Sequence, residues 1–140
     1  MKILFVEDND TFRELLQYAL ESFGYVVETA CDGLAGLEKL EEESYDLLIT
    51  DNHMPRMGGL KLIEETSQRE MDTKTVLISG DLTKEIVERA QYWGVCECLA
   101  KPFSLDSLRE TVHRVLEEAK VSKREGGFSQ PSQLLEAAAL

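Results

Sequence analysis

The sequence lacks the features that mark membrane-spanning, secreted and nucleic-acid-binding proteins. Its 140 residues contain no apolar run of transmembrane length, and no signal peptide opens the chain. Basic residues are few, since 15 lysines and arginines stand against 27 aspartates and glutamates, a net charge of −12. Because nucleic-acid binding needs a basic surface, this balance argues against it and favours binding of a cation or a basic partner. We therefore expect a cytoplasmic protein that binds neither nucleic acid nor a membrane directly.

Cysteine is also scarce, and its placement excludes a zinc site. Cys31, Cys96 and Cys98 are odd in number and lack the spacing of zinc ligands. Cys96 and Cys98 alternate along an expected strand, so they would share one face of it. We predict three free core thiols in a reducing compartment.

What the sequence does contain is a strand followed by a helix, five times over. Short apolar runs that predict strands lie at 3–6, 25–29, 75–79 and 95–100, with a further run that ends at Asp51. No glycine-rich dinucleotide motif or Walker loop follows the first run. The alternation predicts one α/β domain, with a five-stranded parallel sheet flanked by five helices and right-handed crossovers.

Each expected helix has a start signal, a stop signal or an apolar stripe. Asn9 or Asp10 would cap the first, Asp81 or Thr83 the fourth and Ser104 the last. Stop signals are Gly24 and Gly94. The stripes expected to be buried in the first and last helices are Phe12, Leu15, Leu16, Ala19, Leu20 and Phe23, and Leu105, Leu108, Val112, Val115, Leu116 and Ala119.

The last twenty residues differ in character from the rest. From Val121 the chain becomes polar, with glycine, serine and proline in the stretch 123–132, as in a linker. The segment 133–140 is a candidate helical stub, too short to be a domain. We therefore predict a domain at 1–120 and a linker-like tail at 121–140.

Five side chains with complementary chemistry sit where the expected strands end: Glu7, Asp8, Asp51, Ser79 and Lys101. Parallel strands deliver them to one edge of the sheet, the edge where ligands bind in open α/β folds. Two unit charges about 4 Å apart repel by about 4 kcal/mol at an effective dielectric near 20, and a hard cation such as Mg²⁺ relieves such repulsion. A lysine and a hydroxyl beside carboxylate-held Mg²⁺ suit a phosphoryl group. Taken singly, each residue also fits a solvated loop, a strand-ending turn or a surface lysine.

Together these motifs resemble the receiver domain of two-component response regulators, over Met1 to about Lys120. The resemblance implies a flavodoxin-like sheet of strand order 2-1-3-4-5. It also implies a cis peptide bond between Lys101 and Pro102. The residues that carry it are Glu7-Asp8, Asp51 with Met54-Pro55 and Gly58-Gly59, Ser79-Gly80, and Lys101-Pro102-Phe103.

The resemblance also assigns roles. Asp51 would be the phosphoacceptor, and Ser79 and Lys101 would bind the phosphoryl oxygens. Mg²⁺ would be held by Asp8, Asp51 and the backbone carbonyl of His53, with Glu7 acting through water.

The resemblance further implies partners and an output. The donor would be a sensor histidine kinase or a phosphotransfer protein. The output would pass to an effector domain or partner protein through a face made by the helix around 86–93, the strand at 95–100 and the last helix. On this hypothesis the chain is a signalling domain that assists its own phosphorylation and dephosphorylation, not an enzyme.

One position departs from the family pattern, and two other functions stay open. The family commonly has an aromatic switch residue three places before the lysine, where this chain has Cys98. A small haloacid-dehalogenase-like phosphatase would instead use Asp8 as its nucleophile, which leaves Asp51 without a role. A phosphate-independent interaction module on the same scaffold is the other alternative.

Overall fold

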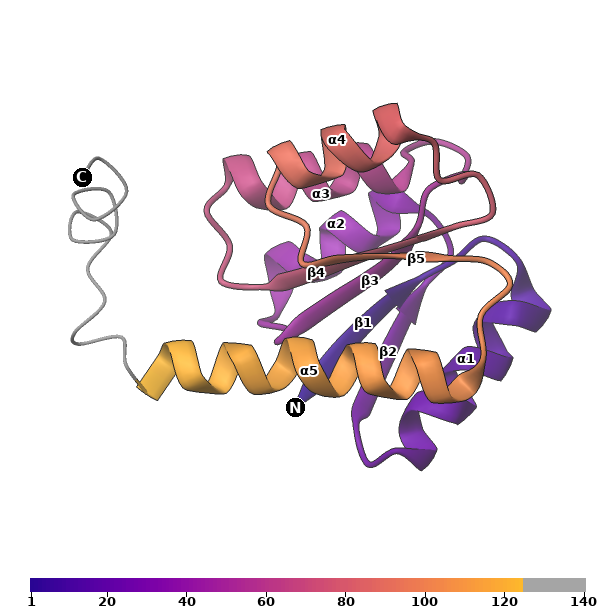
Figure 1. Ribbon diagram of the computed structural model, residues 1–140. Helices are drawn as coiled ribbons and strands as arrows, with labels where there is room; N and C mark the ends of the chain where they lie inside the picture. Colours follow the sequence, from indigo (N-terminus) through magenta and orange to yellow (C-terminus); the bar gives the residue numbers. More distant parts are fainter. Residues whose placement is uncertain (125–140) are drawn as a thin grey trace.

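The computed structural model describes residues 1–124 as a five-stranded parallel sheet with five helices (Figure 1). The strands are β1 (Lys2–Val6), β2 (Val26–Ala30), β3 (Leu47–Asp51), β4 (Lys74–Ser79) and β5 (Glu97–Ala100). The helices are α1 (Asp10–Ser22), α2 (Gly33–Glu42), α3 (Gly59–Gln68), α4 (Lys84–Tyr92) and α5 (Leu105–Arg124). The strands lie in the order β2-β1-β3-β4-β5 and all pair in parallel, which confirms the predicted fold and order.

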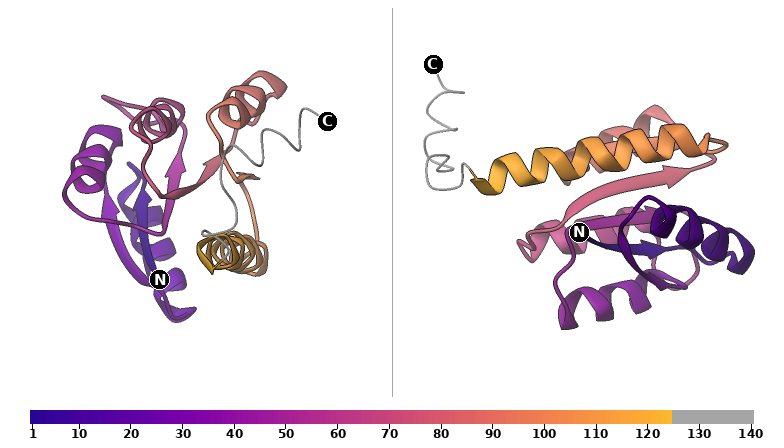
Figure 2. Two further views of the ribbon diagram at one scale, coloured as in Figure 1. Left: turned by 90° about the vertical axis from the view of Figure 1, so that its left-hand side faces the viewer. Right: turned by 90° about the horizontal axis from the view of Figure 1, so that it is seen from below.

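Helices cover both faces of the sheet. Figure 2 shows α1 and α5 on one side, with α2, α3 and α4 on the other. Successive residues of a strand point to opposite faces. Ile3 and Phe5 of β1 therefore pack with residues of α1 and α5, whereas Leu4 and Val6 pack with residues of α2 and α3. The central strands are buried on both sides, so they read as continuous apolar runs rather than alternating ones.

The helix boundaries follow local side-chain chemistry. The Asn9 side chain accepts a hydrogen bond from the Phe12 backbone N–H at 2.9 Å, so Asn9 rather than Asp10 caps α1. Thr83 rather than Asp81 caps α4. The Ser104 hydroxyl accepts the Ser107 backbone N–H at 3.0 Å, as predicted for the start of α5. The stop signal Gly24 has a φ of +99°, which a glycine adopts without steric cost.

Several residues predicted to be buried are exposed. Leu15 is 58% exposed because it lies on the outward side of α1, about 100° around the helix from buried Leu16. Leu105 is 53% exposed because the buried stripe of α5 begins one turn later, at Leu108. The prediction of three core thiols is also wrong. The described thiols are free, but Cys31 and Cys96 are exposed and only Cys98 is half-buried, since β5 begins at Glu97 and leaves Cys96 in the preceding turn.

The C-terminal helix extends beyond the predicted end of the domain. Helix α5 continues to Arg124, so the boundary predicted at residue 120 falls inside it. The linker-like segment after residue 124 and the candidate stub at 133–140 lie outside the described residues. Within residues 1–124, no helix has the length and apolar character needed to cross a membrane.

Candidate functional site

Three carboxylates meet at the carboxyl edge of the sheet. Glu7 and Asp8 follow β1, and Asp51 ends β3, the strand paired with β1. Each offers one carboxylate oxygen, and these three oxygens all lie within 4.8 Å of one another. Glu7 and Asp51 are buried, whereas Asp8 is exposed. We call Glu7, Asp8 and Asp51 the acidic cluster.

Lys101 enters this cluster from the end of β5. Its Nζ lies 3.3 Å from Glu7 Oε2 and 3.3 Å from Asp51 Oδ1, so one ammonium joins two of the three carboxylates. The Lys101 backbone N–H donates to the Ser79 carbonyl oxygen at 2.8 Å, which fixes the start of the loop after β5. The Lys101–Pro102 peptide bond is cis, as the resemblance predicts. The Lys101 ammonium is thus close enough to Asp51 to contact an anionic group attached to the Asp51 carboxylate.

The charge of the cluster exceeds what one ammonium offsets. Burial raises the pKa of the Glu7 carboxyl, and the neighbouring charge of Asp51 raises it further. The Lys101 ammonium lowers the pKa of Glu7, but its effect does not cancel the other two. Carboxylate oxygens this close, with one acid open to solvent, are a donor set that suits a hard divalent cation such as Mg²⁺.

Ser79 ends β4, next to the strand that carries Asp51. Its side chain is fully buried, and its hydroxyl oxygen accepts the Asp81 backbone N–H at 3.0 Å. The hydroxyl therefore links the end of β4 to the loop 80–83 that leads into α4. A group that drew this hydroxyl toward Asp51 would act directly on that loop.

The pair Gly58-Gly59, where the loop 52–58 meets α3, lies very close to the backbone of Asp51 and Asn52. A Cβ on Gly59 would lie 2.2 Å from the Asp51 carbonyl oxygen, and a Cβ on Gly58 would lie 2.7 Å from the Asn52 carbonyl oxygen. Only glycine permits these approaches, which explains the pair in physical terms. His53 lies in this loop and is exposed.

Cys98 lies on β5 opposite Leu77, where the resemblance expects an aromatic residue. It is half-buried in a cluster that includes Ile86 and Trp93, between the sheet and α4. Burial raises the pKa of its thiol above the usual value. A neutral, small side chain therefore occupies this position.

Sequence reasoning missed two residues of α1 that support the cluster. The Phe12 ring lies under the Lys101 ammonium, with Nζ 4.4 Å from the ring centre. The Arg13 guanidinium donates to the Glu7 carbonyl oxygen at 2.9 Å. The available signal was their place in the first turn of the helix that follows Glu7 and Asp8.

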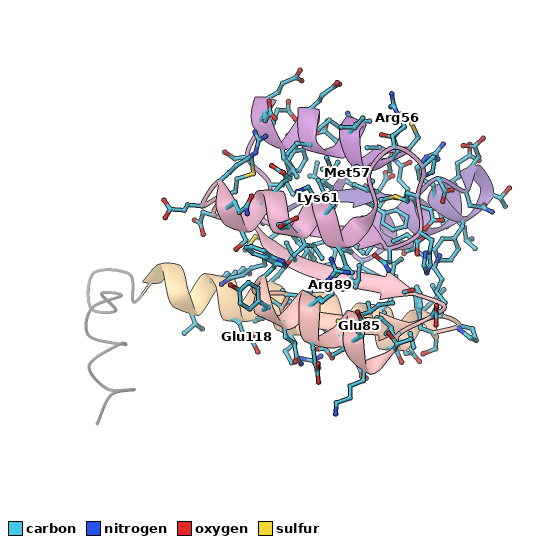
Figure 3. All side chains as sticks on the ribbon, turned by 90° about the horizontal axis from the view of Figure 1, so that it is seen from above. Arg56, Met57, Lys61, Glu85, Arg89 and Glu118 are labelled. Carbon is cyan, nitrogen blue, oxygen red and sulfur yellow. The ribbon has the colours of Figure 1, made fainter. Side chains whose placement is uncertain are left out.

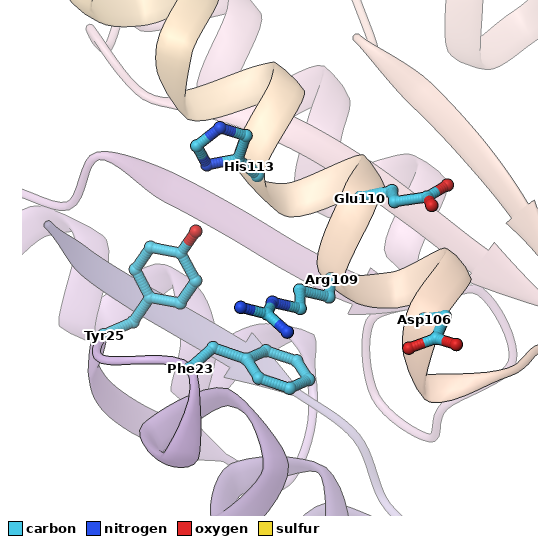
Figure 4. Close-up of a pocket in the computed structure, with 6 residues that line it drawn as sticks. All are labelled: Phe23, Tyr25, Asp106, Arg109, Glu110 and His113. Carbon is cyan, nitrogen blue, oxygen red and sulfur yellow. The ribbon is translucent and has the colours of Figure 1, made fainter.

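Two hollows lie near or below the site. An apolar groove of about 510 Å³ begins at Lys101 and runs between α1 and the start of α5; it is lined by Phe12, Leu15, Leu16, Lys101, Pro102, Phe103 and Leu105. A polar hollow of about 400 Å³ lies between α5 and the α1–β2 turn (Figure 4). There the Arg109 guanidinium lies 5.6 Å from the centre of the Phe23 ring. No lining residue of this second hollow belongs to the acidic cluster.

Comparison with known proteins agrees with this geometry. The chain is 38% identical over 124 residues to the Regulator of RpoS from Escherichia coli, and 32% identical over 123 residues to the sensor histidine kinase RcsC from the same species. Each alignment covers 88% of this chain, but only 37% of the first relative and 13% of the second. The chain therefore corresponds to one part of each of these longer proteins.

Solved structures show the same architecture. The chemotaxis protein CheY4 from Vibrio cholerae is 29% identical, with a TM-score of 0.77 over 81% of this chain and 97% of that one. The response regulator TrrA from Thermotoga maritima, solved in complex with Mg²⁺-BeF, is 32% identical with a TM-score of 0.74 over the same shares. The family model of the response regulator receiver domain matches residues 3–113. The chain thus belongs to the response regulator receiver domains, the phosphorylation-activated signalling switches of two-component systems.

Proposed function

We propose that Asp51 accepts a phosphoryl group from a phosphohistidine on a sensor histidine kinase or phosphotransfer protein in the cytoplasm. The observation that carries this proposal is the environment of Asp51. Its carboxylate ends a central strand, lies 3.3 Å from the Lys101 ammonium and shares a 4.8 Å cluster with two other acids. A carboxylate, an ammonium and a set of oxygen donors therefore lie together, which supports the roles proposed for Asp51, Lys101 and the metal.

The transfer follows from these positions. An Asp51 carboxylate oxygen attacks phosphorus, and a P–O bond forms while the P–N bond to the donor imidazole breaks. The imidazole keeps the electron pair of that bond and then takes a proton. Lys101 turns from the carboxylates to the phosphoryl oxygens, and the Ser79 hydroxyl donates a hydrogen bond to one of them.

Asp8, Asp51 and the His53 backbone carbonyl would hold Mg²⁺, and Glu7 would act through water. Bound there, Mg²⁺ neutralises charge on the phosphoryl oxygens and relieves the repulsion among the acids. In support, the related TrrA was solved with Mg²⁺-BeF.

The apolar groove beside Lys101 is where we place the phosphodonor protein. A donor must bring its phosphohistidine to Asp51, so its surface has to cover the neighbourhood of Lys101. Leu15 and Leu105 line this groove and are more than half exposed, which leaves apolar area for a partner to bury. The groove is continuous with the site, as this role requires.

The signal leaves through the loop 80–83 and α4. A phosphoryl group on Asp51 adds charge and acceptor oxygens, and it draws the Ser79 hydroxyl away from the Asp81 N–H. This biases the α4–β5–α5 face between two arrangements, and an effector domain or partner protein reads that face.

Phosphoryl labelling tests the proposal. We expect a small acyl-phosphate donor with Mg²⁺ to add about 80 Da, one phosphoryl group, to the intact protein. Asp51→Asn should stay unlabelled, whereas Asp72→Asn, which changes an exposed loop acid, should label fully. Labelling that persists in Asp51→Asn and disappears in Asp8→Asn would contradict the proposal and favour a phosphatase-like nucleophile.

A further inference from the structure

An ion pair that the proposed function does not use joins the loop 52–58 to the start of α2. Asp32 is the N-cap of α2, and its Oδ1 accepts the Ala35 backbone N–H at 2.9 Å. Its Oδ2 accepts a hydrogen bond from Arg56 Nε at 2.8 Å, and Arg56 Nη2 forms an ion pair with the same oxygen at 2.6 Å. Because the Asp32 side chain is only 7% exposed, the acid side of this pair is shielded from solvent.

The backbone of Arg56 shows that the loop is held in place. Its φ is +67°, in the left-handed region that a residue with a Cβ rarely adopts. Such a conformation persists only where surrounding contacts determine it, and the hydrogen bond and ion pair with Asp32 are contacts of this kind. Figure 3 looks onto the layer formed by α2, α3 and α4. Arg56 and Met57 lie near one end of that layer.

A backbone contact adds a second attachment at the same place. The Gly33 N–H donates to the Met57 carbonyl oxygen at 3.1 Å, and a Cβ on Gly33 would lie 2.3 Å from that oxygen. At the other end of the loop, the Asn52 N–H donates to the Ile78 carbonyl oxygen at 3.1 Å. His53 therefore lies in a segment that is attached at both ends.

We propose that Asp32 and Arg56 are positioning residues for the metal site. Their ion pair holds the loop 52–58, which carries the His53 carbonyl oxygen that the proposed function assigns as a Mg²⁺ ligand. This inference rests on the proposed function, because it concerns the same Mg²⁺. Partners that orient metal ligands typically change metal affinity by about 10–100-fold. The Arg56 side chain is 59% exposed, so we expect the lower end of that range.

The sign of the effect separates positioning from simple electrostatics. Arg56 is a cation near a site for a cation, so loss of its charge alone would strengthen Mg²⁺ binding. Loss of loop position would weaken it. A weakened affinity in a variant that has lost a positive charge is therefore a specific sign of positioning.

The experiment compares Arg56→Ala, Arg56→Gly and Arg56→Lys with a matched control. Arg69→Ala removes an arginine that pairs with Glu41, so it breaks a link to the other end of the same helix α2. Mg²⁺ affinity is measured by calorimetry, and amide hydrogen exchange of residues 53, 54, 56 and 57 is measured in EDTA. We expect Arg56→Ala and Arg56→Gly to bind Mg²⁺ about 10-fold more weakly and to exchange faster, with Arg69→Ala unchanged.

The remaining variants keep the test decisive. Arg56→Gly accepts the left-handed backbone without cost, so it stays folded if Arg56→Ala does not. Arg56→Lys keeps the charge but not the two-pronged donor, and we expect partial recovery. Wild-type affinity and exchange in Arg56→Gly would overturn the inference. If Asp8→Ala leaves Mg²⁺ binding intact, the proposed function fails, whatever Arg56 does.

Discussion

The two loops that flank Asp51 are held in different ways. The loop 52–58 is attached to α2 by the Asp32–Arg56 pair and by the Gly33–Met57 hydrogen bond. The loop 80–83 is defined by short-range bonds, from the Asp81 N–H to the Ser79 hydroxyl and from the Thr83 N–H to the Asp81 carbonyl. The first arrangement suits a site that must keep its geometry. The second suits a segment that a new group on Asp51 can move.

The helices that follow show the same contrast. Helix α5 buries Leu108, Val112, Val115, Leu116 and Ala119 against the sheet. Helix α4 has one buried residue, Ala90, within the part of the chain that the structure describes. Because local stability follows buried apolar contact, α4 is the helix expected to move at the smallest free-energy cost.

Truncation of one apolar side chain in each helix tests this contrast, with the largest expected effect. Leu108→Ala should lower the free energy of unfolding by about 2–5 kcal/mol, because Leu108 is fully buried. Ile86→Ala should lower it by about 1 kcal/mol, since Ile86 is only half-buried. Urea unfolding measures both. Equal losses would show that α4 is packed as firmly as α5.

Mg²⁺ should stabilise the firmly held side of the site. At about 100 times its dissociation constant, a ligand that binds only the folded state adds about 2.7 kcal/mol. Asp8→Ala should remove most of this gain, whereas Asp72→Ala should keep it. Thermal unfolding with and without Mg²⁺ measures the difference. The same gain in Asp8→Ala would move the metal to another site.

The pH dependence of the metal-free protein should report the strain on Glu7. Its pKa is raised in the folded state, so its ionised form destabilises the fold above that pKa, and the penalty disappears below its unfolded pKa of about 4.3. Glu7→Gln should therefore stabilise the metal-free protein at pH 7 and have little effect near pH 4. Unfolding in EDTA across this range, with exposed Glu42→Gln as control, measures it. A constant difference at all pH values would contradict the charge explanation.

The sequence predicted the parts of this molecule that depend on local pattern and on topology. Parallel strands bring their carboxyl ends to one edge, so the pattern predicted Asp51 and Lys101 at the same edge of the sheet, and the resemblance supplied the strand order. The exposure of Leu15 could not be predicted this way. An apolar residue next to the buried stripe of a helix gives the same sequence pattern whether it is covered or borders an open groove.

Contacts between segments distant in sequence were also beyond pattern. The Asp32–Arg56 pair spans 24 residues and depends on the left-handed backbone at Arg56. The position of Phe12 under Lys101 depends on how α1 and the loop after β5 pack together. Neither aspartate–arginine nor phenylalanine–lysine pairs carry a signal in one sequence.

The smallest expected effect concerns Cys98. A thiol is too small to move between a buried and an exposed pocket as a ring does, so we expect β5 to stay nearly still on activation. Cys98→Ala should respond to phosphorylation almost as wild type does, because a small half-buried side chain becomes slightly smaller. Backbone amide chemical shifts of β5 and α4, recorded before and after phosphorylation, measure both expectations. A lost α4 response in Cys98→Ala would make the thiol part of the switch.

The most direct test of the account compares the two loops in one spectrum. Backbone amide shifts are recorded before and after addition of Mg²⁺ with beryllofluoride as a phosphoryl mimic, relative to Mg²⁺ alone, for wild type and Ser79→Ala. We predict large changes in the loop 80–83 and α4 of wild type, and small changes in the loop 52–58 and α2. Ser79→Ala should bind the mimic yet lose the α4 response, because the hydroxyl that pulls the loop is gone. A full α4 response in Ser79→Ala, or larger changes in α2 than in α4 of wild type, would contradict the account.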